Sequence, residues 1–288
     1  MLRCVIPALR VRRLFHTVEA YQGVDVFPAV VEPWLDEHTD AVREALAPLA
    51  ALGGWTRTEY EFGDPLETAY ALSRVSDALI YKFQPLLPPG SETPWAHDIH
   101  EPERWPRITC DQYLAAFARF GMAPIGDVAF EPFFHEVVHV EQHEYPGAPV
   151  EITGTLWPGL TFGQMLFSRT GVTVRAGARH LVAGIADRSP LHSVFMRRYR
   201  DTFDGSLGWG SNSQWKTDFR RDYLTDAAFH FAIDEEPDSD QDIHGGPRRL
   251  TPPERSDLVR HRCLTRPLQD PEAWHSASPG GRLTVWRT

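Results

Sequence analysis

The chain has 288 residues, of which 42% are hydrophobic and 24% are charged. These values match those of folded globular proteins and exclude a disordered chain. The formal net charge of −10 argues against binding along a nucleic-acid backbone, because such binding requires a clustered basic surface. We therefore expect a packed protein without a nucleic-acid partner.

The sequence disfavours both a membrane span and export. The longest apolar stretch, residues 45–55, is broken by a proline and two glycines and falls short of the roughly 18 residues that a span requires. Arginines between residues 10 and 13 interrupt any secretory hydrophobic segment. Cys4, Cys110 and Cys263 are widely spaced and form no CxxC pair, which argues against a disulfide framework. The sequence predicts a cytoplasmic protein that binds no membrane.

The basic residues are almost all arginines. Only Lys82 and Lys216 are lysines among the 29 basic residues. Arginine stays charged, binds carboxylates with two hydrogen bonds and stacks on aromatic rings, so this usage suits anionic or planar ligands. A coding bias towards arginine explains the same count and is the simpler interpretation.

Helical patterns dominate the first third of the chain. Residues 32–52 place apolar side chains on one stripe, and Gly53-Gly54 ends the pattern. Residues 57–62 alternate like a short strand, and Pro65 then stands at the first position of a helix that reaches about Lys82. A proline-rich tract follows up to residue 108 and has the length of a binding loop or a linker.

Strand patterns dominate the rest of the chain. Thr109-Cys110-Asp111-Gln112 has the form of a capping box and opens a helix that Gly121 ends. Strand-like runs lie between residues 128 and 183, and the turn residues Tyr145-Pro146-Gly147 predict a hairpin between two of them. Further runs are residues 227–233 and 283–286.

These patterns predict an α+β chain in two regions. Residues 1–108 form a mainly helical region that ends in the proline-rich loop, and residues 109–288 form a region rich in antiparallel strands with a few helices. A barrel is one arrangement that we consider for the second region. The candidate site also lies in this region.

The densest group of possible metal ligands is the run His135-Glu136-Val137-Val138-His139, an HExxH pattern. On a helix, residues four apart share a face, so His135 and His139 can bind one zinc ion while Glu136 acts as general base. These five residues resemble the zincin metallopeptidases. The resemblance implies a zinc-dependent hydrolase acting on a small molecule or a peptide, with a third ligand still unassigned.

A strand over the same residues leads to a different metal site. The valines are β-branched and favour a strand, in which residues four apart lie about 13 Å from each other. The run 172–180 resembles the second metal motif of the cupin barrels, with Arg175 in place of its proline. That resemblance implies a non-haem iron oxygenase that uses His139, Glu141 and His180.

A third hypothesis needs no metal. Glycines, amides and two indoles gather in residues 208–216, a composition that can line a pocket for a small molecule. Trp209, Asn212 and Trp215 are the candidate ligand-binding residues of a binding or cyclase-like protein. We rank zinc-dependent hydrolysis first, iron-dependent oxidation second and metal-free binding third.

Overall fold

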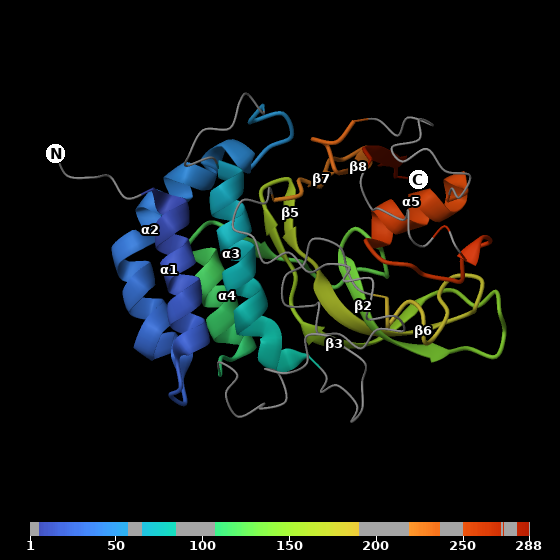
Figure 1. Cartoon of the computed structure of the whole chain (residues 1–288), viewed down its shortest axis with the longest axis horizontal. Helices are drawn as coiled ribbons and strands as arrows, with labels where there is room; N and C mark the ends of the chain where they lie inside the picture. Colours follow the sequence, from blue (N-terminus) through green and yellow to red (C-terminus); the bar gives the residue numbers. More distant parts are fainter. Residues whose placement is uncertain are drawn as a thin grey trace.

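A computed structural model of the chain describes residues 6–56, 65–84, 107–189, 219–236, 250–271, 273 and 281–287. The fold is mixed α+β, as the sequence predicts. Figure 1 shows helices α1 to α4 gathered at one side of the molecule and the strands, together with α5, at the other. None of the helices in the described ranges has the length and apolarity that a bilayer-spanning segment needs.

Four helices precede the main strands in the described part of the chain, and all but α1 were predicted from the sequence. They are α1 (Pro7–Ala20), α2 (Glu32–Leu46), α3 (Pro65–Ile80) and α4 (Cys110–Ala118), with the short helical turns η1 (Phe27–Val31), η2 (Ala47–Leu49) and η3 (Tyr81–Phe83). α2 ends earlier than expected, because Pro48 lacks the N–H that an α-helix requires. The capping box before α4 is present, with the Gln112 N–H donating to Thr109 Oγ1 at 3.1 Å. The strand expected over residues 57–62 lies outside the described residues.

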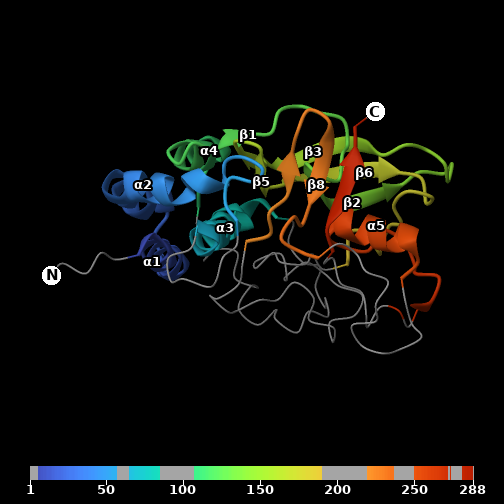
Figure 2. The same ribbon diagram turned by 90° about the horizontal axis from the view of Figure 1, so that it is seen from above.

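Six strands form an antiparallel sheet in the order β1-β4-β5-β7-β8-β9. They are β1 (Ala123–Pro124), β4 (Leu160–Phe162), β5 (Met165–Ser168), β7 (Tyr223–Leu224), β8 (Ala228–Phe231) and β9 (Leu283–Trp286). Helix α5 (Pro252–His261) lies beside this sheet and the second one, as Figure 2 shows. In the described residues neither sheet closes into a barrel, so the barrel arrangement is not the one found.

The second sheet has three strands in the order β2-β6-β3. They are β2 (His135–Gln142), β6 (Thr170–Ala176) and β3 (Glu151–Trp157). β2 runs parallel to β6, whereas β3 runs antiparallel to it. The expected hairpin through Tyr145-Pro146-Gly147 is therefore wrong, since β6 lies between the two strands that the turn was expected to pair.

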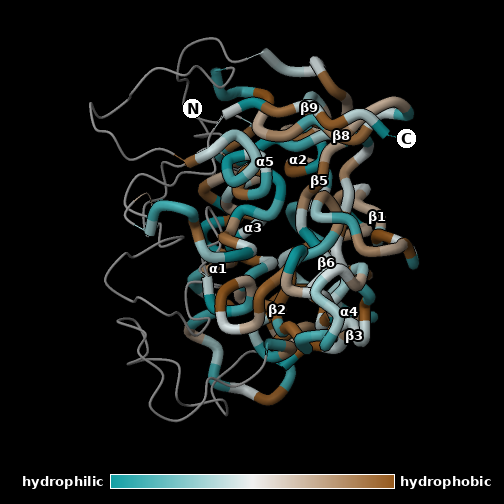
Figure 3. Tube along the Cα trace, turned by 90° about the vertical axis from the view of Figure 1, so that its right-hand side faces the viewer, coloured by the Kyte–Doolittle hydropathy of each residue, from teal (hydrophilic) through white to brown (hydrophobic). Residues whose placement is uncertain are grey.

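One large hydrophobic core joins the two predicted regions. It packs buried side chains of the N-terminal helices against those of β4, β5 and β7. Backbone and side-chain bonds support this junction: the Tyr223 hydroxyl donates to the Leu49 carbonyl at 2.9 Å, and the Gln164 N–H donates to the Ala50 carbonyl at 2.8 Å. In Figure 3 hydrophobic and hydrophilic residues alternate along the trace, as expected for elements with one buried face. The division of the chain into regions 1–108 and 109–288 stays a prediction.

Candidate functional site

The HExxH run forms a strand, so the helix that zinc binding requires is wrong. In β2, His135 pairs with Thr170 and Val137 with Val172, but the next paired residue is His139, opposite Thr173. Val138 is thus an extra residue in the strand, a β-bulge. A bulge shifts the alternation of faces, so His139 lies on the opposite face of the sheet from His135.

The two histidines also have different surroundings. His135 is buried, and its Nδ1 lies 3.0 Å from the Glu131 carbonyl oxygen. The His139 side chain is exposed, and its Nδ1 lies 3.6 Å from Asp187 Oδ2. Glu136 is buried and projects to the same side as His139. This geometry does not bring the predicted zinc pair together, and the presence of a metal stays a prediction.

The residues of the iron hypothesis are not assembled either. Glu141 is on the exposed face of β2 and forms an ion pair with Arg175, whose Nη2 lies 2.9 Å from Glu141 Oε2. His180 lies in a turn after β6 and is exposed. Within the described ranges, no group of three His, Cys, Asp or Glu side chains is suited to hold a metal ion. Trp209, Asn212 and Trp215 fall outside the described residues.

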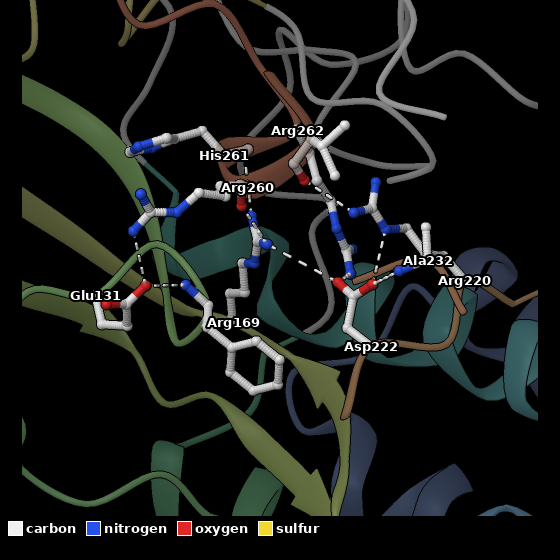
Figure 4. A network of polar contacts seen from close by, with 10 residues as sticks. Glu131, Arg169, Arg220, Asp222, Ala232, Arg260, His261 and Arg262 are labelled. Carbon is white, nitrogen blue, oxygen red and sulfur yellow. Dashed lines mark hydrogen bonds and ion pairs between the residues drawn. The ribbon is translucent and has the colours of Figure 1, made fainter. Parts of the chain in front are cut away.

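A different set of residues converges on Asp222, which is fully buried just before β7. Arg220 Nε donates to Asp222 Oδ1 at 2.9 Å, and Arg262 Nη2 donates to Oδ2 at 2.6 Å. Arg169, between β5 and β6, places its Nη2 4.0 Å from Oδ2. Figure 4 shows these groups around the carboxylate, with the Ala232 N–H donating to Oδ1 at 2.8 Å. We call Arg169, Arg220, Asp222 and Arg262 the Asp222 cluster.

The C-terminal end of α5 completes this cluster. Arg169 donates to the carbonyls of Arg260 and His261 at 2.7 and 3.0 Å, and Arg220 donates to the Val259 carbonyl at 2.8 Å. The last carbonyls of a helix lack partners within the helix and carry a partial negative charge. The arginines satisfy these carbonyls and are attracted by that charge.

Two residues at the cluster adopt an unusual backbone conformation. Ala232 has a φ of +48° and Arg262 a φ of +61°, and they are the only non-glycine residues with positive φ in the described part of the chain. For residues with a Cβ atom this left-handed conformation costs about 1–2 kcal/mol. Asp222 binds the backbone N–H of Ala232, whereas Arg262 is the C-cap of α5 and binds Asp222 through its side chain. Such strain is concentrated at functional sites more often than elsewhere.

The cluster holds more positive than negative charge. Burial alone raises the pKa of Asp222, but the charges of Arg220, Arg262 and Arg169 hold it far below its ordinary value. Burial, followed by repulsion from Arg262, lowers the pKa of Arg169 well below its ordinary value despite the attraction of Asp222. Glu235 adds a weaker attraction for Arg220. Among the residues that the structure describes, the buried Nε atoms of Arg169 and Arg262 have no hydrogen-bond partner.

A second group of polar and aromatic residues adjoins the cluster across Arg169. Arg260 Nη2 lies 3.4 Å from Glu131 Oε1. The Phe130 ring stacks between the rings of His135 and His261, with centroid distances of 5.6 and 6.2 Å. Burial, followed by the charges of Arg169 and other arginines, lowers the pKa of His261 to about 3. His261 is therefore neutral at physiological pH.

The fold and this site together define a mixed α+β protein with a buried cationic cluster at the end of a helix. Comparison of the chain with protein-family models, with curated proteins and with solved structures finds no significant match. Sequence patterns missed the site, because its arginines lie about 40 to 50 residues apart. The preference for arginine over lysine was the one signal that pointed towards it.

Proposed function

We propose that this protein binds a small anionic molecule, with a carboxylate, phosphate or sulfate group, at the Asp222 cluster. The observation that carries the proposal is the convergence of three guanidinium groups, one buried and two largely buried, on one buried carboxylate. Among the three hypotheses from the sequence, the proposal belongs to metal-free small-molecule binding. It places the ligand at arginines rather than at tryptophans.

The charges support an anionic ligand. The cluster itself has three guanidinium groups and one carboxylate, and repulsion from Arg262 and Arg220 adds to burial in lowering the pKa of Arg169 well below its ordinary value. Buried charges are destabilising unless they are paired and hydrogen-bonded, and the partial charge at the end of α5 offsets only part of the excess. An anion placed beside the arginines would balance the charge.

The geometry offers a way to bind it. Arginine binds carboxylates and phosphates through two parallel N–H groups. The Nε atoms of Arg169 and Arg262 have no hydrogen-bond partner in the described part of the chain. The side chains of Arg220 and Arg262 retain 11% and 13% of their accessible surface. A small anion can therefore approach from the edge of the cluster that these two residues form.

The two metal-dependent hypotheses remain open to test but draw no support from the geometry of β2. Zinc hydrolysis needs His135 and His139 on one face, and the bulge at Val138 separates them. Iron oxidation needs Glu141, which is paired with Arg175.

Thermal unfolding in the presence of different anions tests the proposal. Sulfate, phosphate and citrate should each raise the melting temperature above that measured in chloride at the same ionic strength. A ligand at 100 times its Kd stabilises the folded state by about 2.7 kcal/mol. In Arg262→Gln this rise in melting temperature should be lost. Arg175→Gln, which removes an exposed arginine near the end of β6, is the matched control and should keep it.

A folded Arg262→Gln variant with the full increment contradicts the proposal. If that variant does not fold, Arg220→Lys provides the second test, since lysine keeps the charge but not the paired N–H groups. The Arg220→Lys variant should bind these anions at least 10-fold more weakly than the wild type. Absence of any increment in the wild-type protein, for all three anions, also contradicts the proposal.

A further inference from the structure

His261 is the last residue of α5 and stands between two arginines of the site. Its carbonyl accepts a hydrogen bond from Arg169 Nη1 at 3.0 Å, and its sequence neighbour Arg262 binds Asp222. Figure 4 shows its ring beside the Arg260 side chain, on the far side of Arg169 from the carboxylate. The imidazole thus shares its cationic surroundings with the Asp222 cluster.

The charged groups around this imidazole are mostly positive. Arg169, Arg260 and Arg266 each oppose a positive charge on it, from the β5–β6 turn, from α5 and from the segment after α5. Two carboxylates of these surroundings are already paired: Glu131 with Arg260, and Asp257, four residues before His261 on α5, with Arg266. Neither ring nitrogen of His261 has a hydrogen-bond partner within the described residues. Nothing in this part of the chain therefore favours the protonated ring.

We infer that anion binding at the Asp222 cluster is coupled to uptake of a proton by His261. This inference rests on the proposed function and adds that anion binding depends on pH. An anion bound at the edge formed by Arg220 and Arg262 adds negative charge to these cationic surroundings and so offsets part of the positive charge that opposes protonation. The proton and the anion then favour each other, and by thermodynamic linkage each raises the affinity for the other by the same factor. The pKa of the ring, about 3, lies far below the ordinary value for histidine, so a nearby anion can raise it.

Nuclear magnetic resonance of the histidine rings tests the coupling. The Cε1–H signal of His261, assigned by its absence in His261→Gln, is titrated with acid in the presence of sulfate and in chloride at the same ionic strength. Sulfate is still mostly a dianion at the expected midpoints of this titration. We expect the pKa of His261 to be higher in sulfate by about one unit, which corresponds to about 10-fold tighter sulfate binding to the protonated protein.

The variant His261→Gln separates this effect from the general gain of positive charge at low pH. It removes the ring and keeps the backbone carbonyl that Arg169 contacts. Its sulfate affinity near neutral pH should match that of the wild type within about twofold, and its affinity should rise less on acidification. Sulfate binding with an unchanged pKa of His261 overturns the coupling alone. No sulfate binding by the wild type overturns the proposed function and, with it, the coupling.

Discussion

Asp222 is the residue on which the candidate site depends. Its carboxylate accepts hydrogen bonds from Arg220, Arg262 and the Ala232 N–H, and it is fully buried. Removal of one member of a buried charge network is far more damaging than removal of a surface pair, because it leaves buried charges without compensation. The site and the stability of this part of the fold therefore share one carboxylate.

The variant Asp222→Asn should destabilise the protein by about 3–5 kcal/mol in urea unfolding, because three buried guanidinium groups lose their common partner. Glu141→Gln removes a carboxylate from the exposed pair with Arg175 and should change stability by less than about 1 kcal/mol. If both substitutions lower the free energy of unfolding by the same small amount, Asp222 is not the common partner of the three arginines.

The neutral His261 gives the stability a dependence on pH. The folded protein keeps this ring neutral down to about pH 3, whereas an unfolded histidine has its ordinary pKa of 6.5. Between these values the unfolded state binds more protons, so stability falls as the pH falls. The contribution of this residue is up to about 1.4 kcal/mol per pH unit.

Urea unfolding at several pH values checks this contribution. The loss of stability between neutral pH and about pH 4 should be smaller in His261→Gln than in the wild type, because glutamine takes up no proton. Equal slopes for the two proteins would mean that His261 titrates alike in the folded and unfolded states.

At the scale of the elements, local signals in the sequence were sufficient for several helices and strands. Thr109 and Gln112 predicted the start of α4, and the alternation in residues 227–233 predicted β8. The HExxH run was ambiguous, because His and Glu suit a helix site while its valines favour a strand. The run forms strand β2, the structure that its valines favour.

Features that depend on residues far apart in the sequence could not be predicted from these local signals. The bulge at Val138 depends on the register with β6, a partner more than 30 residues later. The predicted hairpin failed for a related reason, since β6 rather than β2 is the neighbour of β3. The Asp222 cluster is assembled from three separate places in the chain, so no local motif marks it.

Helix α5 holds the carbonyl groups that the arginines bind, and its first turn stabilises it. Thr251 and Glu254 form a capping box, in which the Thr251 N–H donates to Glu254 Oε2 at 2.8 Å. Thr251→Ala should lower the free energy of unfolding by about 1 kcal/mol, measured in urea, because an N-cap hydroxyl is lost. Thr251→Ser keeps the hydroxyl and should be close to the wild type. An alanine variant as stable as the serine variant would contradict this role of the cap.

At the scale of the whole molecule, the core crosses the expected boundary at residue 108. Helices of the first region pack on strands of the second, and Arg221 bridges them: it binds Asp234 through two nitrogens and the Trp55 carbonyl at 2.8 Å. The predicted change from helices to strands was right, whereas the joint core was not visible in the sequence. The site therefore rests on a frame to which both regions contribute.

Metal content separates the proposed function from the metal-dependent hypotheses. Elemental mass spectrometry of untagged protein, purified without chelators and dialysed against zinc and iron, should find no stoichiometric metal, because β2 places His135 and His139 on opposite faces. A metal present at one per chain and lost in His139→Ala would instead restore a metal-dependent enzyme as the better hypothesis.

The position of a bound anion tests the central claim most directly. Crystals grown without competing anions and soaked in selenate, a sulfate analogue with an anomalous signal, would locate it. The account predicts one strong anomalous peak within hydrogen-bonding distance of Arg220 and Arg262, and its loss in Arg262→Gln. Peaks confined to exposed arginines such as Arg175, with none at the Asp222 cluster, would contradict it.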